Sequence, residues 1–129
     1  MSAIRLERVY PRSPAAVWRA LTEPELHAKW WAPGDVRPIV GHRFELDMGA
    51  WGKQACEVLE VETERRFRYR FGIGTLDTVI TWELHAEGSG TRLVLVHDGF
   101  DPSSPMAQKA LEGMGAGWPR VLERLATVA

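Results

Sequence analysis

The chain has 129 residues, of which 45% are hydrophobic and 26% charged, and its 16 basic and 17 acidic side chains give a net charge of −1. This length and composition predict one globular domain over residues 1–129 and exclude a disordered or fibrous chain. The balanced charge disfavours nucleic-acid binding, and no apolar run is long enough to predict membrane insertion.

A strand over residues 4–10 is predicted to begin the fold, and two short helices follow it. Ser13 has the position of an N-cap, with a proline at the first helical position after it. Thr22 is predicted to cap the second helix, which carries Trp30 on its inner side.

The middle of the chain has the period of two that is typical of strands. The predicted strands cover residues 44–48, 53–62, 66–71, 76–84 and 93–97. Because each strand alternates apolar with polar residues and short turns join them, we expect a curved antiparallel sheet with one buried face.

A long helix is predicted to begin at a cap formed by Ser103 or Ser104 and to run toward Ala129. Its apolar residues repeat every three or four positions, so one face should lie on the sheet. Residues 113–117 contain three glycines, each of which costs a helix about 1 kcal/mol relative to alanine. This run predicts either a hinge over a cavity or close packing of the helix against the sheet.

Four segments carry a family resemblance: residues 16–26 (AVWRALTEPEL), 29–33 (KWWAP), 90–100 (GTRLVLVHDGF), and Gly117-Trp118 followed by Leu122 and Leu125. They resemble the START-like, birch-pollen-allergen-like (SRPBCC) superfamily and, within it, the family named for homologues of the activator of heat-shock-protein-90 ATPase. The resemblance covers nearly the whole chain. It implies an α+β helix-grip fold, in which a curved antiparallel sheet of six or seven strands wraps around a long C-terminal helix.

The resemblance also implies a cavity between sheet and helix, which binds apolar small molecules in relatives. Tryptophan favours the walls and rims of such cavities, and the chain has six. The residues predicted to bind a ligand are Trp30, Trp31, Met48, Tyr69, Phe71, Thr78, Ile80, Trp82, Leu95, His97, Met114 and Trp118. The alternative is a closed core that these side chains fill completely.

Individual tryptophans have different predicted positions. Trp82 and Trp118 should face each other across the grip. The adjacent Trp30 and Trp31 should close one end of it. Trp51 is expected at an exposed hairpin tip.

Two residues are candidates for catalysis if the cavity holds an active site. His97 is the one histidine on a predicted inward face, either as a general base or as a structural histidine. Glu57 lies where the strand alternation is ambiguous. It either faces the interior as an acid or base, or a bulge leaves it in solvent.

Cys56 is the single cysteine, which excludes an internal disulfide and fits a reducing compartment. Because residues 1–5 also lack the apolar stretch of a signal peptide, we expect a cytoplasmic protein. No pair among the four histidines has the spacing of a metal site, and we predict no metal and no cofactor.

These observations predict a non-catalytic protein that binds an apolar, aromatic or lipid-like small molecule. A cyclase, dehydratase or hydrolase-like enzyme in the same cavity is one alternative, and a chaperone-interacting module is another. The sequence also allows a homodimer, in which the edge strand over residues 4–10 would form one contact.

Overall fold

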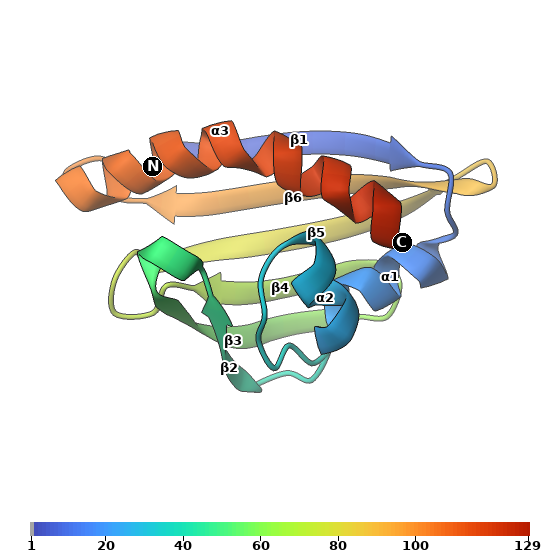
Figure 1. Cartoon of the computed structure of the whole chain (residues 1–129), viewed down its shortest axis with the longest axis horizontal. Helices are drawn as coiled ribbons and strands as arrows, with labels where there is room; N and C mark the ends of the chain where they lie inside the picture. The colour runs from blue at the N-terminus through green and yellow to red at the C-terminus, as the bar shows by residue number, and fades with distance from the viewer. Residues whose placement is uncertain (1) are drawn as a thin grey trace.

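A six-stranded antiparallel sheet with a long helix along it forms most of the computed structural model, which describes residues 2–129 (Figure 1). The elements in chain order are β1 (Ser2–Tyr10), α1 (Pro14–Thr22), α2 (Pro24–Trp30), β2 (Arg43–Asp47), the 3₁₀ helix η1 (Gly49–Trp51), β3 (Lys53–Glu62), β4 (Arg66–Phe71), β5 (Thr78–Glu87), β6 (Gly90–Phe100) and α3 (Pro105–Val128). The predicted α+β helix-grip fold, with two short helices after the first strand, is confirmed.

The strand order in the sheet is β1-β6-β5-β4-β3-β2. Strands β2 to β6 therefore form a meander of sequential neighbours, and β1 joins it beside the last strand. In Figure 1, α3 runs along β1 and β6, and its C-terminal half meets α2. The 3₁₀ helix η1 lies near the other end of α3.

The starts of α1 and α3 follow the predicted signals. Ser13 and Ser104 are the N-caps, and the Oγ of each accepts a 3.2 Å hydrogen bond from the backbone N–H three residues further on. The predicted cap of α2 is wrong, because Glu23 holds that position without a side-chain hydrogen bond. The Thr22 hydroxyl instead donates to the Trp18 carbonyl at 2.8 Å, one turn back in α1.

Strand β3 contains a register shift just after Val58, so the predicted bulge is confirmed. Cys56 and Val58 are buried on the core side. The alternation turns Glu57 to the outer face, where its carboxylate lies 3.6 Å from Arg70 and 3.7 Å from Arg43. The interpretation of Glu57 as an inward acid or base is therefore wrong.

The second half of α3 closes its end of the grip. Trp118, Leu122 and Leu125 are each at most 2% exposed. The Tyr10 hydroxyl donates to the Leu122 carbonyl at 2.8 Å, which ties β1 to α3. Among residues 2–129, no helix has the length and apolarity needed to span a membrane.

Candidate ligand-binding site

An apolar pocket of about 440 Å³ lies between residues 106–121 of α3 and the end of the sheet near η1. Its lining residues are Trp31, Met48, Trp51, Gln54, Phe71, Thr75, Leu76, Met106, Ala110, Gly113, Met114, Gly117, Trp118 and Val121. No lining side chain carries a charge. The volume lies within the range of roughly 300–1,000 Å³ that small-molecule sites occupy. Side chains therefore do not fill this end of the grip.

Three aromatic rings from different elements form a continuous wall of the pocket. Trp31 follows α2, and its ring centroid lies 4.7 Å from that of Trp118 on α3. It also lies 5.8 Å from the ring of Phe71, at the end of β4. The wall exists because α2, β4 and α3 meet at this place.

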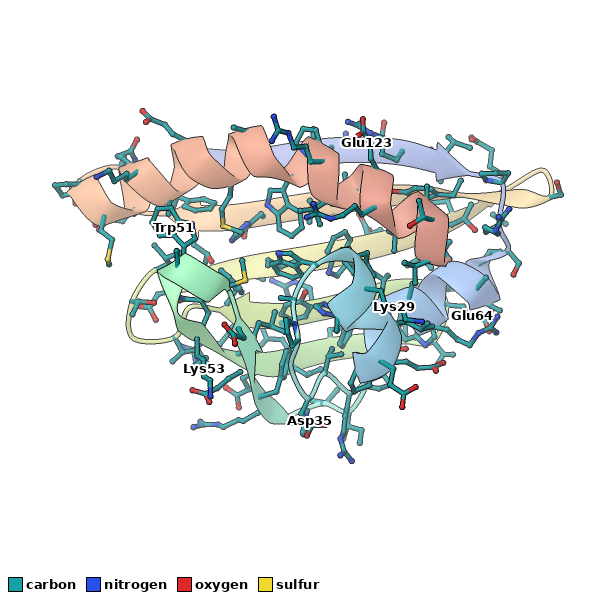
Figure 2. The ribbon with its side chains drawn as sticks, in the orientation of Figure 1. Lys29, Asp35, Trp51, Lys53, Glu64 and Glu123 are labelled. Atoms are coloured by element: carbon teal, nitrogen blue, oxygen red, sulfur yellow. The ribbon has the colours of Figure 1, made fainter. Side chains whose placement is uncertain are left out.

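Trp51 stands at the mouth of the pocket. Figure 2 shows it on η1, close beneath α3. Its side chain lines the pocket although the residue is 66% exposed. The predicted exposure is confirmed, but Trp51 is not among the residues predicted to bind a ligand.

The predicted ligand-binding residues divide into two groups. Five line the pocket: Trp31, Met48, Phe71, Met114 and Trp118. The other seven do not line it and are fully or almost fully buried behind it: Trp30, Tyr69, Thr78, Ile80, Trp82, Leu95 and His97. The predicted cavity includes residues that belong to the core. Strand alternation identifies the inward face of the sheet but does not show which part of that face α3 covers.

Trp118 separates the pocket from this buried group. Its ring centroid lies 5.6 Å from that of Trp82 at an angle of 81°, so the two tryptophans face each other as predicted. The Trp82 indole N–H donates to the Tyr69 hydroxyl at 3.1 Å. Trp30 packs edge-on against Trp82 at 5.7 Å and donates to the Ala20 carbonyl at 2.7 Å. Trp30 is therefore a core residue and not, as predicted from the sequence, one of the ligand-binding residues at the end of the grip.

His97 belongs to a buried chain of hydrogen bonds behind Trp118. The Trp118 indole N–H donates to His97 Nδ1 at 3.3 Å. The Thr78 hydroxyl donates to the Phe71 carbonyl at 2.9 Å, so the 2.9 Å contact between His97 Nε2 and Thr78 Oγ1 requires the proton on Nε2. Burial lowers the pKa of His97 to about 3. The imidazole is neutral, has both nitrogens engaged and orients Trp118.

His27 is a second buried histidine, which sequence reasoning placed on no inward face. It is 1% exposed and packs against the rings of both Trp30 and Trp31, at centroid distances of 4.9 and 5.3 Å. Its Nδ1 donates to the Ala32 carbonyl at 2.6 Å. Burial lowers the pKa of His27 to about 4. A short helix of seven residues carries too little periodicity to reveal this position.

The glycine run over residues 113–117 of α3 was predicted to act as a hinge or to allow close packing against the sheet. The helix is continuous from Pro105 to Val128. A Cβ added to Gly115 or Gly117 would have no atom within 4 Å, so close packing against the sheet is wrong. Gly113 and Gly117 instead line the pocket.

Nine lining residues lie outside the predicted ligand-binding set: Trp51, Gln54, Thr75, Leu76, Met106, Ala110, Gly113, Gly117 and Val121. Leu76 was assigned to a strand, but β5 begins at Thr78 and Leu76 lies in the loop before it. The helical members recur every three or four positions, so the spacing itself contained a signal for one shared face.

The fold and this pocket define a helix-grip protein of the START-like SRPBCC superfamily. The model of the family described as Activator of Hsp90 ATPase homolog 1-like protein matches residues 11–129, and the chain belongs to that family. None of the curated proteins compared with this chain matches it.

Solved structures of bacterial proteins share the fold. Protein MLL2253 from Mesorhizobium loti is 33% identical, with a TM-score of 0.88 over 98% of this chain and 96% of that one. Protein BH1534 from Bacillus halodurans is 26% identical, with a TM-score of 0.85 over 99% and 96% of the two chains. Aha1 from Colwellia psychrerythraea, a dimer in solution, is 17% identical, with a TM-score of 0.82 over 98% and 94%. This last likeness concerns the fold alone.

Proposed function

We propose that this protein binds an apolar small molecule in the pocket between α3 and the sheet. The observation that carries the proposal is an uncharged pocket of about 440 Å³ in a fold whose other half is filled by side chains. Apolar surface left in contact with water costs about 25 cal/mol per Å². A ligand that covers this surface recovers that free energy.

The aromatic wall of Trp31, Phe71 and Trp118 is the proposed contact surface for the ligand. Met48 and Met114 are flexible and polarizable, so they can adjust to its outline. The buried residues behind the wall have a supporting role in this proposal. His97, for example, fixes the indole of Trp118 through the hydrogen bond at Nδ1.

The lining supports binding without catalysis. None of the lining side chains titrates near neutral pH, so the pocket itself offers no general acid or base. His97 lies behind Trp118, and Glu57 lies on the outer face of the sheet. Replacing His97 with glutamine should therefore alter stability and not a chemical step.

Titration with N-phenylnaphthylamine, an uncharged apolar fluorescent probe, tests the proposal. We expect saturable binding of one probe per chain. Met114→Glu should abolish it, because the new carboxylate would have to lose its hydration inside the pocket. Ala116→Glu is the matched control, because Ala116 is exposed on the same helix and does not line the pocket. Failure of the probe and of every other neutral apolar compound to bind would overturn the proposal.

A homodimer through β1 is a further proposal. In the sheet described, β1 pairs with β6 alone, so its other edge has backbone groups available for a second copy. The Colwellia psychrerythraea Aha1 protein is a dimer, which supports self-association without locating it. Light scattering at increasing concentration tests this, and a monomer mass throughout would exclude it.

A further inference from the structure

The wall that α3 contributes to the pocket is bare at two positions. Gly113 and Gly117 lie four residues apart on one face of the helix and both line the pocket. A Cβ at Gly117 would meet nothing within 4 Å, and one at Gly113 would meet only the Trp51 ring, at 4.0 Å. Glycine lowers helix stability, and neither packing nor a positive φ requires it here. Because these two glycines have no side chains, they leave space in the pocket that larger residues would fill.

The space sets the size and shape of the occupant. An apolar cavity of about 150 Å³ holds one benzene ring. The pocket, at about 440 Å³, therefore has room for two or three fused rings. The aromatic wall of Trp31, Phe71 and Trp118 faces this space, and aromatic rings stack in offset or edge-to-face geometries with such a wall. The shape favours a flat ring system over a flexible chain.

The lining also sets the charge of the occupant. It contains no Lys, Arg, His, Asp or Glu. An ionised ligand would lose its hydration shell and find no opposite charge. The pocket therefore favours a neutral ligand.

Gln54 and Thr75 place hydrogen-bonding capacity in the lining. The Gln54 amide donates to the Trp51 carbonyl at 3.0 Å through Nε2, which has a second N–H. Gln54 Oε1 lies 3.1 Å from the Thr75 hydroxyl, whose single proton is also within 3.0 Å reach of the Gly72 carbonyl. When the Thr75 hydroxyl donates its one proton to the Gly72 carbonyl, Gln54 Oε1 can accept a hydrogen bond from a ligand. The second N–H of Gln54 Nε2 can donate one.

We infer that Gly117 and Gln54 determine the specificity of the pocket: the bare helix face admits a flat ligand of two or three fused rings, and the Gln54 amide binds one uncharged hydroxyl or amide group on it. This inference rests on the proposed function. It adds the class of ligand and assigns two residues to its selection.

Calorimetric titration with four compounds at pH 7 tests the ligand class. The compounds are naphthol, naphthalene, naphthoate and decanol, which vary the polar group, the charge and the flat shape in turn. We expect naphthol to bind most tightly. Naphthalene should bind about fivefold more weakly, the value of one net hydrogen bond. Naphthoate, which is ionised, should bind at least about tenfold more weakly than naphthol.

Variants test the two residues. Gln54→Leu should remove the preference for naphthol over naphthalene, because leucine cannot hydrogen-bond the hydroxyl group. Gly117→Leu should abolish binding of all ring compounds by filling the pocket. Gly115→Leu is the matched control, because Gly115 is on the same helix, is exposed and does not line the pocket. Gly117→Ala, a smaller change, should reduce affinity if the leucine variant does not fold.

The outcomes separate this inference from the proposed function. Naphthoate binding as tightly as naphthol, or an unchanged preference for naphthol in Gln54→Leu, would overturn the inference while pocket binding stands. Binding of decanol without binding of the ring compounds would do the same. Failure of all four compounds and of N-phenylnaphthylamine to bind would overturn both.

Discussion

The two halves of α3 lie over the same sheet but cover it differently. The C-terminal half begins at the pocket with Gly117, Trp118 and Val121 and then places Leu122 and Leu125 in the core, each at most 2% exposed. The N-terminal half presents small residues, Ala110 and Gly113 among them, to an open pocket. Figure 1 shows the C-terminal half of α3 beside α2, whereas η1 lies near its other half. The grip is filled where large side chains and two helices meet, and open where glycines face a short 3₁₀ helix.

The filled half stabilises the fold, and the open half is the half suited to binding. In the filled half, buried polar groups have partners, such as the Trp30 indole on the Ala20 carbonyl at 2.7 Å. In the open half, Met106 and Trp51 remain 53% and 66% exposed and contribute little burial. Substitutions in the filled half should therefore change the free energy of unfolding, and those in the open half should change affinity.

Trp82→Ala tests the filled half most severely. Trp82 is 1% exposed and packs against Trp30 and Trp118, so its truncation leaves a large cavity and removes the hydrogen bond to Tyr69. We expect a loss of about 3–5 kcal/mol in the free energy of unfolding, measured by urea denaturation. A loss below about 1 kcal/mol would mean that this half is not the stabilising core.

The two buried histidines should make the filled half sensitive to acid. Burial lowers the pKa of His97 to about 3 and of His27 to about 4, whereas both titrate near 6.5 in the unfolded chain. Between these values the unfolded state binds protons that the folded state does not. The free energy of unfolding should therefore fall as the pH drops below about 6.5, by about 1.4 kcal/mol per pH unit for each histidine.

His97→Gln isolates one of these contributions. The amide can still donate to Thr78, and it does not titrate. The slope of stability against pH between about 6 and 4.5 should be smaller than in the parent protein by about 1.4 kcal/mol per pH unit. Equal slopes in urea denaturation across this range would show that His97 is not held neutral by burial.

Much of the fold could be predicted from the sequence. Serine followed by proline located the starts of α1 and α3, and the alternation of period two located the sheet. The opposition of Trp82 and Trp118 also followed from the pattern. Local signals are sufficient for such features, because caps and alternation act over a few residues.

The extent of the pocket could not be predicted in the same way. Alternation places Ile80 and Leu95 on the inner face, but only the path of α3 over the sheet decides that they are covered. The contribution of Trp51 and Leu76 depends on how two loops approach the helix. The glycines were noted for their cost, yet their role depends on what lies opposite them, which periodicity does not contain.

Gly115→Ala and Gly117→Ala separate the helical stability of α3 from its contribution to the pocket. Both changes should stabilise α3 by up to about 1 kcal/mol, because alanine loses less backbone entropy than glycine. Only Gly117 lines the pocket, so only Gly117→Ala should weaken binding of N-phenylnaphthylamine. Paired thermal unfolding and probe titrations measure both effects. Equal affinity in the two variants would mean that the helix face at Gly117 does not limit the pocket.

Trp51→Ala should have the smallest effect on stability and therefore separates the halves most clearly. The side chain is largely exposed, and its ring would lie 4.0 Å from a Cβ added at Gly113 on the opposite side of the pocket mouth. We expect a change below about 0.5 kcal/mol in the free energy of unfolding, as for surface substitutions. Probe affinity should fall, because the ligand would lose an aromatic contact worth about 0.5–1.5 kcal/mol. A large loss of stability with unchanged affinity would instead place Trp51 with the core and reverse the assignment of the two halves.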